Sequence, residues 1–282
     1  MRKDEVMEVK RILFPTDFSE KTEKAIPFLI NMAEKTNSEI VFFHAYKVPE
    51  MVVDLPYDTI KDEVKAFEET ALKSLDQLTE KIKAINSKIS VKNVAKPGHF
   101  TSELNPVIEE YKVDLVIMAT KGIEGIVTTI FGTHAEKVIE VVNVPVIVLP
   151  QQTNFSTIKN VVFASEYHES DIETIQFLSG IAGLFDADLT IINVYAENLI
   201  LERLRTNEFQ DMVKEEVSYP KLHFKYLKGD DVYSTIETYV EENNVELVAM
   251  TTHHRKLFEK LFHDSVTQKM VKHGKTPILA FH

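Results

Sequence analysis

The sequence predicts an α/β protein made of two doubly wound domains, each with a parallel sheet covered by helices on both faces. The chain of 282 residues is long for one compact domain and suits two of ordinary size. Short runs rich in Val, Ile, Leu and Phe alternate with helical patterns, which is typical of βαβ units. The same succession of runs also occurs twice along the chain.

The internal repeat locates the two domains. Four segments of the first copy recur in the second: 12–17 as 161–166, 40–46 as 189–195, 114–120 as 246–252, and 144–149 as 276–281. The first two pairs are 149 residues apart and the last two are 132 apart, so the second copy is 17 residues shorter between its second and fourth strands. We predict a first domain at 1–150, a polar linker at 151–157 and a second domain at 158–282.

Helical patterns fill the segments between the strands of the first copy. After the first strand, apolar residues at helical spacing predict a helix with Ser19 as N-cap and Pro27 as a kink. Residues 57–85 carry many Lys and Glu beside an apolar stripe, which predicts an amphipathic helix lying over the sheet. A further helix is expected after Gly132, with apolar residues at Ala135, Val138, Ile139 and Val142.

Composition excludes several classes of protein. The chain is 44% hydrophobic and 27% charged, as expected of a globular protein. Its formal charge of -12 repels nucleic-acid phosphates and anionic lipid, so neither is an expected partner. It has no Cys, which excludes disulfides and thiolate chemistry. A charged start without a signal-peptide core, and no run of membrane-spanning length, predict a soluble cytoplasmic protein.

Two loops of the first copy follow strands, where open parallel sheets bind ligands. In the first loop, Asp17 could hydrogen-bond a ribose or an adenine edge, or it could cap the next helix, and the spacing does not decide between these roles. In the second loop, Gly122 and Gly132 permit close approach of a ligand, and Thr133 adds a hydroxyl at a helix start. Taken alone, such glycines serve a turn more often than a phosphate site.

These loops resemble those of the universal stress protein family. The resemblance rests on the segment Pro15-Thr16-Asp17-Phe18-Ser19, the spacing Ala119-x2-Gly122-x9-Gly132-Thr133, and the last strand Val144-Pro145-Val146-Ile147-Val148. It covers both halves, as in a tandem member with two domains. It implies an adenine nucleotide alpha hydrolase-like fold for each half and a pseudo-two-fold relation between them. Members that hold ATP carry the pattern Gly-x2-Gly-x9-Gly-Ser/Thr.

The resemblance also implies a ligand and a site. The implied site residues are Asp17, Val41, Ala119, Gly122, Gly132, Thr133 and His134. Asp17 and Val41 would line the adenosine. Gly122, Gly132, Thr133 and His134 would surround the phosphates of ATP or AMP, and Mg²⁺ could bind with these phosphates. Ala119 stands where ATP-holding members have Gly, and its methyl group is tolerated if the backbone there keeps a negative φ.

The second copy departs further from this pattern. Glu166, Thr251, His254, Asp264 and Ser265 stand at the places of Asp17, Ala119, Gly122, Gly132 and Thr133. The carboxylate of Asp264 would repel phosphate, and the glycines are lost. We therefore expect one nucleotide per chain, bound in the first copy.

A metal site is not expected. His253, His254, His263 and His282 are the candidate ligands. Adjacent histidines point apart on a strand, and no familiar zinc spacing accompanies them. Solvated loop histidines are the favoured interpretation.

Three classes of function remain open. The first is a stress-response protein whose ATP or AMP occupancy changes its shape or its partners, including a still unidentified protein partner. The second is a slow ATP hydrolase, which is disfavoured because the loop supplies Lys121 but no Walker-type Gly-Lys-Ser/Thr, so at most weak ATPase activity and no catalytic residue are expected. The third is a ligand-free interaction protein, for which Ala119 is the main argument.

The resemblance makes one prediction about assembly. Single-domain relatives pair through their last strands, so 144–149 should lie antiparallel beside 276–281. The covalent link would then make the chain an intramolecular pseudo-dimer, with a homodimer as a further option.

Overall fold

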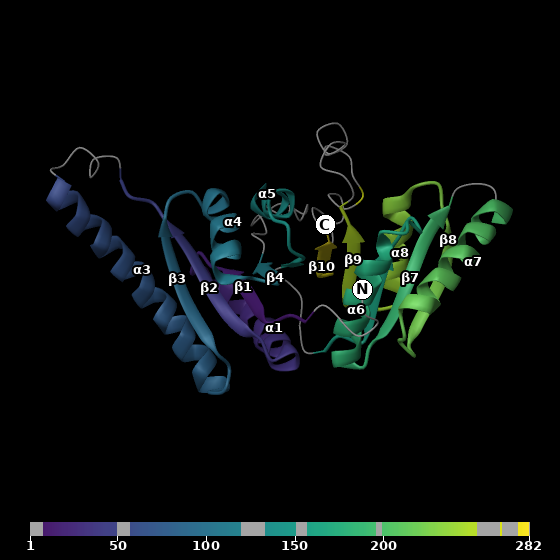
Figure 1. The fold of residues 1–282 in the computed structure, drawn as a ribbon, viewed down its shortest axis with the longest axis horizontal. Helices are drawn as coiled ribbons and strands as arrows, with labels where there is room; N and C mark the ends of the chain where they lie inside the picture. Colours follow the sequence, from purple (N-terminus) through teal and green to yellow (C-terminus); the bar gives the residue numbers. More distant parts are fainter. Residues whose placement is uncertain are drawn as a thin grey trace. The chain divides into compact units, whose positions relative to one another are not determined.

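The computed structural model describes residues 8–49, 57–119, 133–150, 157–195, 199–252, 266 and 276–281. The chain divides into two compact units. We call residues 9–119 with 137–144 the N-terminal unit, and residues 145–282 with 1–8 and 120–136 the C-terminal unit. Both units alternate strands and helices (Figure 1), which confirms the predicted α/β fold class.

The N-terminal unit has a parallel four-stranded sheet in the order β3-β2-β1-β4. Its elements are β1 (Arg11–Pro15), α1 (Glu20–Thr36), β2 (Glu39–Tyr46), α3 (Tyr57–Ile85), β3 (Val91–Pro97), α4 (Phe100–Tyr111) and β4 (Leu115–Ala119), followed by α5 (Thr133–Val141), which crosses the division between the units. The chain runs outward from β1 to β3 and then returns to the other side of β1 as β4. The β1/β4 pair is therefore the topological switch point of this sheet.

Helix α1 begins and ends through backbone geometry. Ser19 is its N-cap, as predicted, but the Ser19 side chain makes no capping bond to the helix. The helix continues through Pro27 and ends before Asn37, which has a left-handed φ of 53° and donates its N–H to the Ala33 carbonyl. The face that packs on the sheet is apolar and buried at Ala25, Ile26, Phe28, Leu29, Ile30, Met32 and Ala33.

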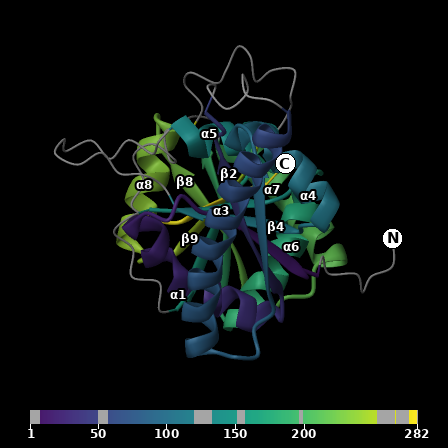
Figure 2. The same cartoon turned by 90° about the vertical axis from the view of Figure 1, so that its left-hand side faces the viewer.

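Helix α3 spans the residues that the amphipathic pattern predicts. It packs on β2 and β3 and faces the viewer in Figure 2. Its buried stripe consists of Ala71, Leu75, Leu78 and Ile82. Of the helices that the structure describes, none is long and apolar enough to cross a membrane.

The C-terminal unit repeats this arrangement with two further strands. Its elements are β5 (Val146–Leu149), β6 (Asn160–Ala164), α6 (Asp171–Phe185), β7 (Asp188–Tyr195), α7 (Leu199–Glu216), β8 (Leu222–Lys228), α8 (Val232–Glu242), β9 (Leu247–Thr251) and β10 (Ile278–Phe281). The strand order is β5-β10-β9-β6-β7-β8, with β6/β9 as the switch point. Helix α7 has 18 residues against 29 in α3, so most of the shortening predicted for the second copy falls in this helix.

Strand β5 lies antiparallel to β10, which confirms the predicted pairing of the last strands. Ile147 stands opposite Leu279, and Val148 opposite Ile278. All other strand pairs with a described register are parallel. A strand of the first sequence copy thus completes the sheet of the C-terminal unit. The domain boundaries at 150 and 158 and the two-fold relation stay predictions.

A carboxylate fixes the amino end of the first strand in each sequence copy, β1 and β6. One oxygen of Asp114, just before β4, accepts the N–H groups of Lys10 and Arg11 at 2.8 Å each. In the other unit, one oxygen of Glu246, just before β9, accepts those of Lys159 and Asn160 at 2.8 and 2.7 Å. Each carboxylate links the two strands of its switch point and sets their register.

The β5–β10 pair supports a stability prediction. Leu279 is fully buried beside Ile147, so Leu279→Ala should lower the free energy of unfolding by about 2–5 kcal/mol through lost burial and a residual cavity. The matched control is Leu184, which lies on α6 of the same unit and is 40% exposed. Leu184→Ala should change the free energy of unfolding by about 0.5 kcal/mol or less. Urea unfolding measures both, and equal effects would contradict the burial of this strand pair.

Candidate functional site

The ligand edge of the N-terminal sheet lies at the carboxyl ends of β1 and β4, because these strands form its switch point. The loop after β1 is fixed there by three hydrogen bonds of Thr16. Thr16 donates its N–H to the Phe43 carbonyl at 2.9 Å. The Thr16 carbonyl contacts Nδ1 of His44 at 2.8 Å, and the Thr16 hydroxyl accepts the N–H of Phe18 at 3.0 Å. Thr16 itself is buried.

Phe18 completes this loop in a strained conformation. Its φ of 60° lies in the left-handed region, which is uncommon for a bulky residue. Its ring lies 4.5 Å from the ring of His44, centroid to centroid. The strain and the packing together fix the direction of the chain, which leaves Asp17 exposed at the ligand edge.

The Asp17 carboxylate is oriented by the start of α1. Its Oδ1 accepts the N–H of Ser19 at 3.1 Å and the hydroxyl of Thr22 at 2.9 Å. The Ser19 and Thr22 hydroxyls are also 3.3 Å apart. Because Ser19 is the N-cap, these contacts support the start of α1 from the residues before it, and they orient the carboxylate at the end of β1.

Ala119 and Val41 occupy different levels of the sheet. Ala119 is the last residue of β4 and is half-buried. It is not among the described residues with positive φ, so its methyl group causes no backbone strain there. Val41 lies in the middle of β2, opposite Leu13 and Lys92, and its side chain is fully buried.

The remaining predicted site residues belong to the second loop. Thr133 and His134 are the first two residues of α5, so Thr133 stands at a helix start as the sequence predicts. Gly122 and Gly132 lie outside the described residues, as do His254, Asp264 and the four histidines considered for a metal. Within the described ranges, no group of three or more His, Asp or Glu side chains could hold a metal ion. The phosphate part of the site stays a prediction.

Sequence reasoning did not single out Thr22 or His44, although both contact the loop that carries Asp17. A threonine in the first turn of a helix is common, and a histidine near the end of a strand belongs to no motif. Neither residue therefore indicates a contact with this loop. The repeat itself held a usable signal, because position 22 corresponds to Asp171 and position 44 to Asn193 in the second copy. The amide of Asn193 donates to the Ser165 carbonyl at 2.9 Å, in the same place as the contact of His44 with Thr16.

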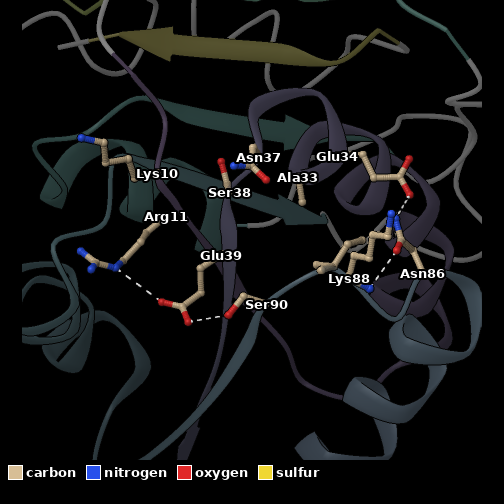
Figure 3. A pocket seen from close by; sticks show the side chains of 11 residues that line it. Lys10, Arg11, Ala33, Glu34, Asn37, Ser38, Glu39, Asn86, Lys88 and Ser90 are labelled. Atoms are coloured by element: carbon tan, nitrogen blue, oxygen red, sulfur yellow. Dashed lines mark hydrogen bonds and ion pairs between the residues drawn. The ribbon is translucent and has the colours of Figure 1, made fainter.

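A cavity of about 760 Å³ lies at the opposite edge of the N-terminal sheet, around the amino ends of β1 and β2 (Figure 3). Its polar side chains largely bind one another. Glu39 lies 3.5 Å from Arg11 and accepts the hydroxyl of Ser90 at 2.9 Å, while Asn86 donates to Glu34 at 2.7 Å. Because sheets of this class bind ligands at the carboxyl edge, the cavity is a weaker candidate than the switch point.

Comparison with known proteins identifies the family. The fold and the loop at the switch point define a doubly wound protein with two similar halves. The model of the universal stress protein family matches residues 8–150 and again residues 157–282. The chain belongs to this family and contains two copies of its domain.

Relatives and solved structures agree with this assignment. A universal stress protein of Synechocystis is 27% identical over 186 residues, a match that covers 65% of this chain and 63% of that protein. One from Methanocaldococcus jannaschii is 27% identical over 144 residues, covering 50% and 81%. The crystal structure of a universal stress protein from Archaeoglobus fulgidus has a TM-score of 0.78 at 18% identity and covers 96% of this chain and 97% of its own. That likeness shows the fold.

The contact between Thr22 and Asp17 leads to a prediction. Thr22→Val keeps the side-chain shape but removes the donor to the carboxylate, so the free energy of unfolding should fall by about 1 kcal/mol. Thr70 on α3 is exposed, and its hydroxyl donates to the Ala66 carbonyl one turn before it, so Thr70→Val should have a smaller effect. Chemical unfolding compares the two variants. A Thr22→Val variant as stable as the parent would count against the orienting contact.

Proposed function

We propose that the chain holds one adenine nucleotide, ATP or AMP, in its first domain and acts as a regulatory or sensing module in a stress response. The main support is Asp17. It is an exposed carboxylate at the switch point, and Ser19 and Thr22 hold it in one orientation. A carboxylate in this position can accept hydrogen bonds from ribose hydroxyls or an adenine amine.

The proposed phosphate end rests on α5 and on the sequence before it. The first N–H groups of a helix lack partners within the helix and favour an anion, and α5 begins at Thr133. Gly122, Gly132 and Thr133 keep the spacing of ATP-holding relatives, and His134 follows. Mg²⁺ could bind together with the phosphates. Ala119, the departure from that pattern, causes no backbone strain.

Two other functions are weaker. A ligand-free interaction protein would explain the degenerate second copy but does not require an exposed, oriented carboxylate at the switch point. An ATP hydrolase needs a positioned water and cationic or metal help at the γ-phosphate, and the sequence supplies only Lys121 near it. We therefore propose a binding module that is not an efficient enzyme. A cytoplasmic location, an intramolecular pseudo-dimer and an unidentified protein partner are parts of the same proposal.

The decisive test is what the purified protein carries. Denaturing it and analysing the supernatant by chromatography should release an adenine nucleotide, at no more than one per chain. Calorimetric titration of the emptied chain with ATP should also give one site. Two equal sites would contradict the division between the copies, and no nucleotide in either experiment would favour the ligand-free interaction protein.

A substitution at Gly132 locates the phosphates. Gly132→Asp copies Asp264 of the second copy and places a negative charge at the proposed phosphate position. Binding of a fluorescent ATP analogue should weaken at least about tenfold, which corresponds to about 1.4 kcal/mol, with little change in unfolding temperature. Gly132→Asn, of equal size but uncharged, is the matched control and should retain more affinity. Unchanged binding by both variants would contradict the assignment of this loop.

A further inference from the structure

The two copies place a carboxylate at different positions around the same loop. In the N-terminal unit, Asp17 is exposed and binds the Thr22 hydroxyl. In the C-terminal unit, Glu166 stands at the place of Asp17 and is exposed, while Asp171 stands at the place of Thr22. The oriented carboxylate of the first copy is therefore replaced in the second by one on the first turn of α6.

Asp171 is fully buried and has hydroxyl partners on both sides. Its Oδ2 accepts the hydroxyl of Ser165 at 2.6 Å and the N–H of His168 at 3.3 Å. Its Oδ1 accepts the hydroxyl of Thr251 at 3.3 Å. Ser165 directly follows β6 and Thr251 is the last residue of β9, so one carboxylate joins the carboxyl ends of both strands at the switch point.

The loop from Ser165 to Tyr167 has the same backbone contacts as the loop from Thr16 to Phe18. Ser165 donates its N–H to the Ile192 carbonyl at 2.9 Å, as Thr16 does to Phe43. Tyr167 has a φ of 59° and donates its N–H to the Ser165 hydroxyl, as Phe18 does to Thr16. After the shared loop, α1 begins at Glu20, whereas α6 begins at Asp171, two positions later by the repeat. The two copies therefore differ in their side chains and in the start of this helix.

The N-terminal unit lacks the chemistry for such a link. Ala119 stands at the place of Thr251 and has no side-chain hydrogen-bonding group. The Thr22 hydroxyl, at the place of Asp171, is bonded to Asp17. The carboxyl ends of β1 and β4 therefore cannot be joined by the equivalent side chains.

We propose that Asp171, Ser165 and Thr251 form an internal bridge that closes the switch point of the C-terminal unit to ligands. The inference rests on the proposed function, because it explains why only the first copy takes a nucleotide. A ligand entering between β6 and β9 would have to separate donors from a buried carboxylate and leave polar groups unsatisfied. The exclusion is thus local to the adenosine end and independent of the lost glycines.

A double-mutant cycle tests the bridge without any ligand. Thr251→Val and Asp171→Asn keep side-chain shape, and each should lower the unfolding temperature by about 4 °C or more. The unfolding temperature of the double variant should fall by clearly less than the sum of the two single falls, because both changes remove the same interaction. Thr251→Ser retains the hydroxyl and should stay close to the parent. The control is Thr238→Val, at an exposed position of α8. Its effect on the unfolding temperature should simply add to that of Asp171→Asn.

Transplanting the bridge tests the exclusion. Thr22→Asp with Ala119→Thr gives the N-terminal unit the side chains of Asp171 and Thr251. The double variant should unfold at a higher temperature than Thr22→Asp alone. It should also bind a fluorescent ATP analogue at least about tenfold more weakly than Thr22→Asp alone, which equally lacks the Thr22 donor to Asp17.

The outcomes separate the two proposals. An additive cycle for Thr251 and Asp171 overturns the bridge. Coupled substitutions with unchanged ATP affinity in the transplanted variant overturn the exclusion. If the parent chain binds no ATP, the proposed function and the ligand-excluding role both fail, and the cycle alone then decides whether the bridge exists.

Discussion

The geometry of each switch point depends on the carboxylate at its amino end. Asp114 binds the N–H groups at the start of β1 while its own N–H donates to the Arg11 carbonyl, so β1 and β4 are held in one register. Glu246 does the same for β6 and β9. A slip of one residue would turn every side chain of the strand to the opposite face. The level of Thr16 beside Ala119, and of Ser165 beside Thr251, follows from these contacts.

With the backbone fixed in this way, the two copies can differ in chemistry at little cost to the fold. The loops after β1 and β6 share their turn, their left-handed residue and their bond to the neighbouring strand. What differs is where the carboxylate lies and whether it is exposed. Any difference in function between the two halves therefore lies in individual side chains, since both halves share the fold.

The sequence predicted the repeat, the strands near each switch point and the helix at 57–85, because long periodic patterns survive in a single sequence. It did not locate β3 and β8, whose Lys, His and Asn residues interrupt the apolar pattern at the end of each described sheet. It also missed Asp171. An acidic residue in the first turn of a helix reads as a favourable dipole contact, and its burial depends on Thr251, which is 80 residues away.

The carboxylate of Asp171 lies in the unit that contains the strand pair between the two sequence copies. This unit receives β5 from the first sequence copy, and β10, which pairs with β5, lies directly beside β9. The proposed bridge from Thr251 through Asp171 to Ser165 links β9 to β6 at the edge where sheets of this class bind ligands. It therefore also supports β9 beside β10, the strand that pairs with β5 of the first sequence copy.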